Sequence, residues 1–218
     1  MALELHDVTI AVAGSDLLRA LTARVEPGRV LAVMGPSGSG KSSLLAWIAG
    51  TLEAPFAARG DVRLAGHSVA ALPIQQRRIG LLFQDDLLFP HMSVRDNLLF
   101  ALPAGQGPTA GSAADGRQAR IETAEAALSG AGLNGFGPRA PASLSGGQRA
   151  RVSLLRALLA QPRALLLDEP FSKLDAALRA QMREFTFTTL RERGVPAVLV
   201  THDEADVPTA AQVVRLAA

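Results

Sequence analysis

Cysteine and tyrosine are both missing from this chain of 218 residues. Without cysteine, a disulfide framework and thiol chemistry are excluded. No stretch reaches the roughly 18 uninterrupted apolar residues of a membrane-spanning helix, and charged and polar side chains interrupt the nearest one, Val152–Leu167. The first residues also lack the basic and apolar segments of a secretory signal. The simplest interpretation is a cytoplasmic protein.

Lysine is also scarce. Of the 22 basic residues, only Lys41 and Lys173 are lysine, and 20 acidic residues leave a formal net charge of +2. The arginines are scattered along the chain, with Arg77 and Arg78 as the only adjacent pair. Charge therefore predicts no nucleic-acid surface.

A glycine-rich segment with one of the two lysines predicts a phosphate-binding loop. Glycines let backbone N–H groups converge on an anion, and a strand pattern at Val30–Met34 and a helix pattern at Ser43–Ile48 flank the segment. We expect Lys41 to reach the β- and γ-phosphates, and the Ser42 hydroxyl to ligate Mg²⁺. The residues expected to hold the nucleotide are Gly35, Pro36, Ser37, Gly38, Ser39, Gly40, Lys41, Ser42 and Ser43.

The rest of the chain predicts an α/β fold. Short strands alternate with turns over residues 3–33, and a helical insertion is expected at about 85–160. Apolar runs at Ala164–Leu167 and Ala197–Val200 suit strands that are buried on both faces of a parallel sheet. The remaining predicted elements are strands Leu3–Val12, Leu17–Val25, Asp61–Leu64, Ile79–Phe83 and Val213–Leu216, helices Arg120–Leu128 and Gln148–Leu159, and a loop Pro103–Gly116.

Two acids, Asp168 and Glu169, end the apolar run Ala164–Leu167. Ligands bind at the carboxyl ends of parallel strands in open α/β sheets. We expect Asp168 to hold Mg²⁺ through its hydration shell. Glu169 can accept a proton from the water that attacks the γ-phosphate. Taken alone, the pair could equally be an acidic turn after a strand, and the phosphate-binding loop favours the catalytic interpretation.

A second anion site is predicted where a helix starts at Leu144, Ser145, Gly146, Gly147 and Gln148. Ser145 is a suitable N-cap, and the two glycines leave the helix start open to a close backbone approach. The alternative is an ordinary capped helix.

Two polar residues follow predicted strands. Gln84 ends the run Ile79–Phe83, and its neutral amide can coordinate a metal or a water. His202 follows Val198–Thr201 and can position a γ-phosphate. The ordinary alternatives are a polar strand end and a histidine with a local hydrogen bond, which is the interpretation for His6, His67 and His91.

In this order, GPSGSGKS, Gln84, LSGGQ, LLLDEP and His202 resemble an ABC-type ATPase over essentially the whole chain. Segments such as LLFQDDLLFP and VTHDEADVP are similar to the YnjD-type importer ATPases, relatives of thiamine and polyamine/iron importer ATPases. The resemblance implies a P-loop NTPase with a RecA-like parallel-sheet core. Residues 1–84 and 162–218 would form this core with an antiparallel β subdomain, and 85–161 a helical subdomain that carries the LSGGQ signature.

The resemblance also implies a function. The chain would bind ATP and Mg²⁺ and energise an importer at the cytoplasmic face of the membrane. Two copies would sandwich two ATP molecules, with Lys41 of one copy facing Ser145 of the other and Asp175 in a loop that crosses the interface. Leu87–Asn97 would dock on a separate membrane permease, and a solute-binding protein would act indirectly.

Two features depart from the family pattern. Val12 stands where the family has an aromatic residue that stacks on adenine, and no C-terminal regulatory domain is expected after Val213–Leu216. A cell-division-type ATPase, which regulates a membrane partner without moving solute, shares nearly all these motifs and stays an alternative. A soluble ABC protein of translation or DNA repair is disfavoured, because one cassette without a long insertion is present.

Overall fold

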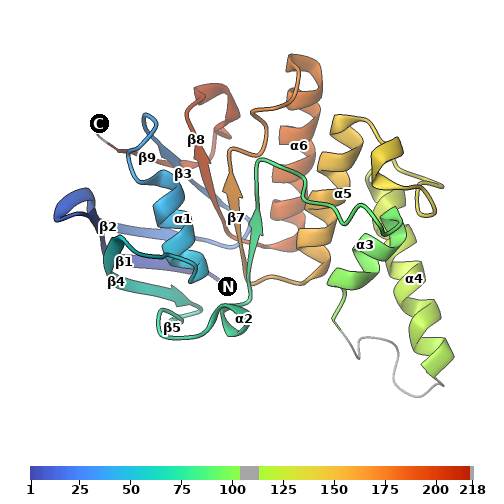
Figure 1. Ribbon diagram of the computed structural model, residues 1–218, viewed down its shortest axis with the longest axis horizontal. Helices are drawn as coiled ribbons and strands as arrows, with labels where there is room; N and C mark the ends of the chain where they lie inside the picture. Colours follow the sequence, from blue (N-terminus) through green and yellow to red (C-terminus); the bar gives the residue numbers. More distant parts are fainter. Residues whose placement is uncertain (104–112, 217–218) are drawn as a thin grey trace. The chain divides into compact units, whose positions relative to one another are not determined.

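A computed structural model describes residues 1–103 and 113–216 of the protein (Figure 1). The chain forms two compact units. One, called here the sheet unit, comprises Met1–Gln84, Pro162–Ser172 and Thr186–Ala218. The other, the helical unit, comprises Asp85–Gln161 and Lys173–Phe185. The sequence placed residues 173–185 with the core, whereas in the structure they group with the helical unit, where Phe185 packs against the apolar core.

An antiparallel sheet forms the first part of the sheet unit, in the order β2-β1-β4-β5. Its strands are β1 (Leu3–Val12), β2 (Ser15–Val25), β4 (Phe56–Leu64) and β5 (His67–Ser68). Val12 pairs with Ser15, so Ala13 and Gly14 alone make the turn, both at positive φ. Because this two-residue turn suits the twist of the strands that it joins, β2 starts two residues before the predicted Leu17.

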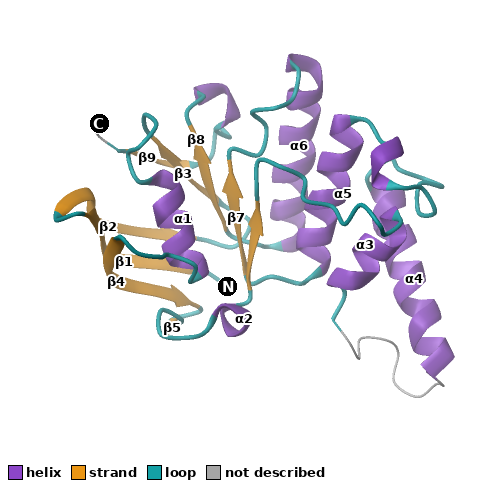
Figure 2. Ribbon diagram, viewed as in Figure 1, coloured by secondary structure: helices purple, strands orange, loops and turns teal. Residues whose placement is uncertain are grey.

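A parallel sheet forms the second part, in the order β6-β7-β8-β3-β9 (Figure 2). Its strands are β3 (Val30–Met34), β6 (Ile79–Leu82), β7 (Ala164–Asp168), β8 (Ala197–Thr201) and β9 (Gln212–Arg215). Every residue of β3 and β8 is buried, as expected for strands covered on both faces. The predicted α/β fold with a parallel core is confirmed, and the carboxyl ends of β3, β8 and β7 are neighbours.

Helix α1 (Lys41–Ala49) contacts strands of both sheets. A buried arginine, Arg77 at the end of α2 (Ile74–Arg77), holds its last turn. The guanidinium donates to the carbonyls of Trp47 (2.8 Å) and Ile48 (2.9 Å), and also to those of Ala70 and Leu72. Burial lowers the pKa of Arg77. The cation therefore satisfies carbonyls that the helix end leaves open.

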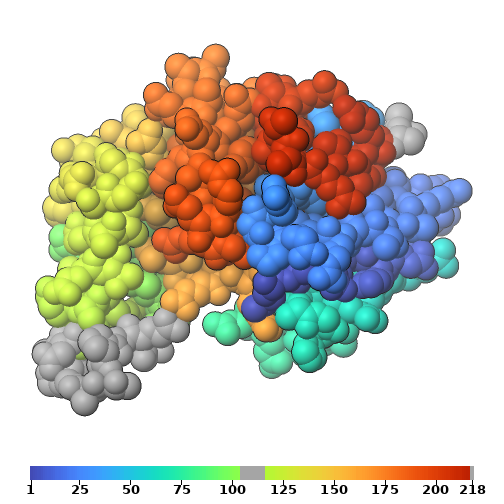
Figure 3. Space-filling view, turned by 180° about the vertical axis from the view of Figure 1, so that it is seen from behind, coloured from blue at the N-terminus to red at the C-terminus, as the bar shows by residue number. Residues whose placement is uncertain are grey.

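The helical unit contains α3 (Val94–Ala101), α4 (Ala113–Gly130), the short η1 (Pro141–Ser143), α5 (Gly146–Leu159) and the start of α6 (Ala176–Arg193). Its core packs Leu98, Leu128 and Val152 together, and α4 covers an outer face of this unit (Figure 3). Within the predicted loop Pro103–Gly116, residues 104–112 lie outside the described residues. The prediction was wrong for 113–116, which form the first turn of α4, where adjacent alanines favour helix.

None of the helices in the described ranges has the length and apolar character that crossing a bilayer requires.

Candidate functional site

The predicted phosphate-binding loop joins β3 to α1. Gly38 and Gly40 have φ values of +84° and +88°, which side chains with a Cβ rarely adopt. Gly40 is the N-cap of α1 and makes no side-chain cap. The first N–H groups of α1 are therefore not engaged by a capping side chain, and the positive end of the helix is open to an anion.

Lys41 is buried inside this loop, with 7% of its surface exposed. Its Nζ donates to the carbonyl oxygens of Gly35 (2.8 Å) and Pro36 (2.7 Å). The loop thus folds around the ammonium group and keeps it beside the start of α1. Ser42 is exposed, and its hydroxyl donates to Asp168 Oδ1 over 3.4 Å, so the structure brings these two predicted site residues together.

Asp168 ends β7, and burial raises the pKa of its carboxyl group. The Ser42 hydroxyl and the Lys41 charge act in the opposite direction, whereas the nearby Glu169 raises this pKa further. Mg²⁺ prefers oxygen ligands and is usually bound through one or two carboxylates, several waters and substrate phosphates. The Ser42 hydroxyl and Asp168 carboxylate fit that donor set. Groups of three or more acidic, histidine or cysteine side chains that could hold a metal are not found within the described ranges.

Glu169 adopts a left-handed backbone conformation, with φ of +44°. This conformation is uncommon for a residue other than glycine and is a marker of strain at functional sites. Its N–H donates to Val200 O, and its Oε1 lies 3.0 Å from His202 Nδ1. The acid after β7 and the histidine after β8 therefore meet, a contact that the sequence did not predict.

Gln84 reaches the same region through Ser172, a residue to which the sequence gave no chemical role. The Gln84 Nε2 donates to Ser172 Oγ over 2.9 Å, and that hydroxyl donates to the carbonyl of Glu169, also over 2.9 Å. Its expected role as a metal ligand stays a prediction.

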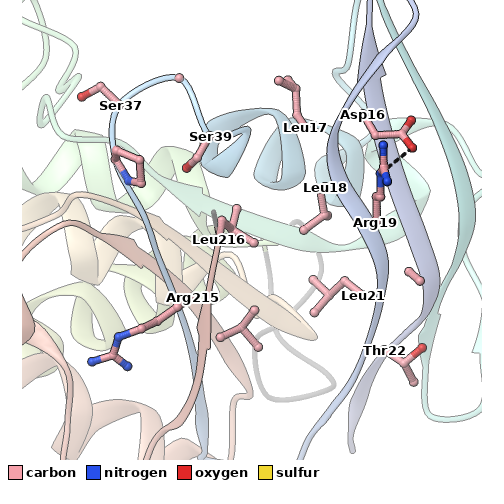
Figure 4. Close-up of a pocket in the computed structure, with 14 residues that line it drawn as sticks. Asp16, Leu17, Leu18, Arg19, Leu21, Thr22, Ser37, Ser39, Arg215 and Leu216 are labelled. Carbon is pink, nitrogen blue, oxygen red and sulfur yellow. Dashed lines mark ion pairs between the residues drawn. The ribbon is translucent and has the colours of Figure 1, made fainter. Parts of the chain in front are cut away.

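Two pockets of the sheet unit border the loop. One, of about 280 Å³, is lined by loop residues, Glu169, Leu17 and Phe56. A larger one, of about 730 Å³, lies between β2, the loop and β9, and its lining includes aliphatic side chains such as Leu18, Leu21 and Leu216 (Figure 4). The buried Ser39 hydroxyl borders it and has no hydrogen-bond partner among the described residues.

The predicted second anion site lies in the helical unit, at the start of α5. The Ser145 hydroxyl accepts from Gln148 N (3.3 Å), and Gln148 Oε1 accepts from Ser145 N (2.9 Å), which makes a capping box. The expectation that Ser145 is an N-cap is therefore confirmed. Leu144 is buried, Gly146 is exposed, and a Cβ on Gly147 would lie 2.3 Å from the side chain of Leu178.

The segment after Gln84 belongs to the helical unit and is bound to α5. Asp86 pairs with Arg149 Nε (2.8 Å), and Ser153 Oγ donates to the Asp86 carbonyl (2.8 Å). Arg149 also donates to Leu144 O (2.7 Å), next to Ser145. A residue that sequence reasoning missed, the fully buried Asn97, holds the following loop by accepting from Phe89 N (2.8 Å) and donating to Phe89 O.

The side chains of this segment divide between core and surface. Leu88 packs into the core of the helical unit, whereas Leu87 is 54% exposed. The half-buried Phe89 ring packs edge-on against Phe100, which is 65% exposed, with ring centroids 4.9 Å apart. Asp175 accepts from Leu178 N and so caps the start of α6.

The sequence carries the phosphate-binding loop, the acidic strand end and the LSGGQ helix start in one order, and a family model described as "ABC transporter" matches residues 18–172. The chain belongs to the ABC transporter family. Membership makes it an ATP-binding ATPase and confirms the resemblance stated above.

Curated relatives of this family align with nearly the whole chain. It is 47% identical over 211 residues to the uncharacterized ABC transporter ATP-binding protein YnjD of Escherichia coli K12, with 97% of this chain and 93% of the relative covered. It is 44% identical over 209 residues to the Fe(3+) ions import ATP-binding protein FbpC of Pseudomonas fluorescens Pf-5, with 94% and 55% covered.

A third relative is the sn-glycerol-3-phosphate import ATP-binding protein UgpC of Paracoccus denitrificans, 41% identical over 207 residues, with 95% of this chain and 56% of the relative covered. The chain thus spans about half the length of these two import proteins.

Proposed function

We propose that the chain is the ATP-hydrolysing subunit of an ABC importer, which works as a homodimer and moves solute through a separate membrane permease. One observation carries the proposal: Lys41, Asp168, Glu169 and His202 stand at the carboxyl ends of three neighbouring parallel strands. Each group is of the type that phosphoryl transfer from ATP to water requires. The subunit would act at the cytoplasmic face of the membrane.

Helix α1 would bind the phosphates of the nucleotide. The open N–H groups of this helix would receive the phosphates, and the Lys41 ammonium, which donates to two loop carbonyls, would add a charge-assisted contact. Ser42 and Asp168 would hold Mg²⁺, which when bound neutralises charge on the β- and γ-phosphates.

The proton acceptor follows from the contact between strand ends. Glu169 would take a proton from the attacking water onto its carboxylate. His202, at 3.0 Å from the Glu169 carboxylate, would fix the direction of that side chain and contact the γ-phosphate. Gln84 would report the state of the site, because Ser172 connects it to the Glu169 backbone.

The test of this function replaces Glu169 with glutamine. Glu169→Gln keeps size and shape but removes the base, so we expect steady-state ATPase activity to fall ~10²- to 10⁴-fold while MgATP binding remains. Size exclusion with MgATP should show a dimer that accumulates. Glu192→Gln, the same change at an exposed position on α6, is the matched control. Turnover near that of wild type in Glu169→Gln would contradict the assignment.

The proposed dimer is supported by a hydrogen-bonding capacity of Ser145 that the capping box does not use. A hydroxyl can accept and donate at once. The Ser145 oxygen accepts from Gln148 N, so its proton is available to a phosphate oxygen of the partner copy. The exposed Gly146 leaves room for that approach. Signature residues Leu144 to Gln148 would therefore complete the site of the other copy, beside a loop that contains Asp175.

The permease contact is proposed at Leu87–Asn97. Phe89 packs against the exposed Phe100, and Leu87 is exposed two residues before Phe89. Exposed apolar surface of this kind marks contact sites. Cysteines at Leu87 and His91, both exposed, are expected to crosslink to the permease in membranes. A cysteine at the exposed Ile74 of the sheet unit is the control. Copurification of the complex without crosslinks at any position from Leu87 to Asn97 would move the contact elsewhere.

The importer is favoured over the cell-division-type alternative because the relatives with an assigned role carry import in their names. At similar identity, the names of those two relatives state import of Fe(3+) ions and of sn-glycerol-3-phosphate. The solute is therefore expected to depend on the permease and on a solute-binding protein rather than on this chain.

A further inference from the structure

An exposed aromatic ring borders the smaller of the two pockets. This pocket, of about 280 Å³, is lined by residues of the phosphate-binding loop, Glu169, Leu17 and Phe56. Leu17 packs directly on the loop, because a Cβ on Gly40 would lie 3.0 Å from Leu17 Cβ. Phe56 keeps 37% of its surface exposed. The lining of the pocket therefore combines charged and polar groups with two apolar side chains, Leu17 and Phe56.

Strand pairing explains why Phe56 reaches this place. Strands β4 and β1 pair antiparallel up to the last residue of β1. There Val12 is paired with Phe56, the first residue of β4. Residues directly opposite each other in an antiparallel pair point to the same face, with Cβ atoms about 4.5–5.5 Å apart. The ring of Phe56 thus emerges beside the position where the family pattern predicts an aromatic residue and this chain has valine.

A bulge sets that pairing. His6 pairs with Asp61 and Thr9 with Arg59, so Asp7 and Val8 of β1 stand opposite the single residue Gly60. Gly60 has φ of +119°, and a Cβ there would lie 2.8 Å from the Asp7 carbonyl oxygen. Only glycine fits this crowded position. If the register of His6 with Asp61 continued without the bulge, Val12 would stand opposite Pro55 and Phe56 opposite Ala11, so the ring would point to the other face of the sheet.

We propose that Phe56 is the stacking platform for the base of the bound nucleotide, and that the site takes purine nucleoside triphosphates with little discrimination between adenine and guanine. The proposal rests on the proposed ATPase function. Stacking tolerates every base, because each base has a π-face. Phe56 and Leu17, the two large apolar side chains of the lining, carry no hydrogen-bonding group that could read the edge of a base.

The experiment separates the base from the phosphates. Binding of non-hydrolysable ATP and GTP analogues and of inorganic tripolyphosphate, all with Mg²⁺, is measured by calorimetry for wild type, Phe56→Ala, Phe56→Leu and Phe56→Trp. We expect Phe56→Ala and Phe56→Leu to weaken both nucleotides about 5- to 150-fold, as loss of one stacked base implies. Tripolyphosphate affinity should stay unchanged, and Phe56→Trp should bind nucleotides as wild type does.

Two controls keep the outcome clear. Ile74→Ala removes another exposed apolar side chain of the same unit, one that does not line the pocket, and should change nothing. Phe56→Leu keeps an apolar side chain at the start of β4, so a loss common to leucine and alanine reports the ring and not the fold. Val12→Tyr added to Phe56→Ala should restore nucleotide affinity.

Nucleotide affinity unchanged in Phe56→Ala would overturn the proposal, and so would an equal loss for tripolyphosphate. A preference of wild type for ATP over GTP above a hundredfold would overturn the part on discrimination. If wild type binds neither nucleotide, the proposed ATPase function itself fails. That result differs from nucleotide binding that is unaffected by Phe56→Ala, which contradicts only the role of Phe56.

Discussion

Two helix starts in this protein carry glycine-rich turns, and they are built in opposite ways. Helix α1 begins at Gly40 without a capping side chain, and a buried lysine stands beside it. Helix α5 begins at Ser145, whose side chain completes a capping box. The N–H groups at the start of α1 are left for a ligand. Those at the start of α5 are capped by Ser145, whose hydroxyl proton stays available for a second contact. The start of α1 therefore suits a site that binds phosphate, and the start of α5 suits a surface that contacts the bound phosphate from the other side.

The largest effect is expected when the start of α1 is inactivated in one copy of the chain and the start of α5 in the other. Lys41→Ala removes a charge-assisted contact worth roughly 1.5–3 kcal/mol, and Ser145→Arg blocks the signature. Each variant alone should lack ATPase activity, but a mixture should recover part of it, because one interface of the mixed dimer pairs an intact loop with an intact signature. Heterodimers that form but show no activity above either variant alone would count against a shared site.

A smaller change separates the two duties of Ser145. Aspartate caps a helix as well as serine does, but its ionised carboxylate only accepts hydrogen bonds, so Ser145→Asp should keep the thermal stability of wild type and lose ATPase activity. Ser145→Ala should lose activity and also about 0.5–2 kcal/mol of stability. Melting curves and steady-state ATPase assays measure both. An active Ser145→Asp variant would show that the contact does not depend on a donor at this position.

The smallest expected effect concerns two aspartates, one beside each helix start. Burial raises the pKa of Asp168, so folding disfavours its ionised form. The stability cost is absent below the ordinary value of 3.8 and grows as the pH rises through the raised pKa. Without Mg²⁺ and nucleotide, Asp168→Asn should therefore melt at a higher temperature than wild type at pH 7, and the difference should shrink toward pH 4.

The matched change is Asp86→Asn in the helical unit, where the carboxylate pairs with Arg149. Loss of this half-buried ion pair should lower the free energy of unfolding by less than about 1 kcal/mol. The melting temperature should therefore fall slightly. If both variants shift the melting temperature in the same direction, the contrast between a ligand-dependent and a self-satisfied helix start is wrong.

The sequence predicted the elements whose signal is local. The strands before Gly35 and Asp168 are uninterrupted apolar runs, and the Ser145 cap uses residues three positions apart, so both could be read from the chain. The meeting of Glu169 with His202 could not, because it depends on a left-handed backbone at a non-glycine residue and on the pairing of β7 with β8. The place of Phe56 depends on a bulge at Gly60, which only strand pairing reveals.

The scarcity of lysine also makes the protein a convenient object for chemical labelling. Only two side chains carry a primary amine, and they differ in access: Lys173 is exposed, whereas Lys41 is buried among loop carbonyls. A mild amine-reactive reagent should therefore modify Lys173 first and Lys41 slowly. The rate at Lys41, followed by mass spectrometry, would report directly how often the empty loop opens and how strongly a nucleotide keeps it closed.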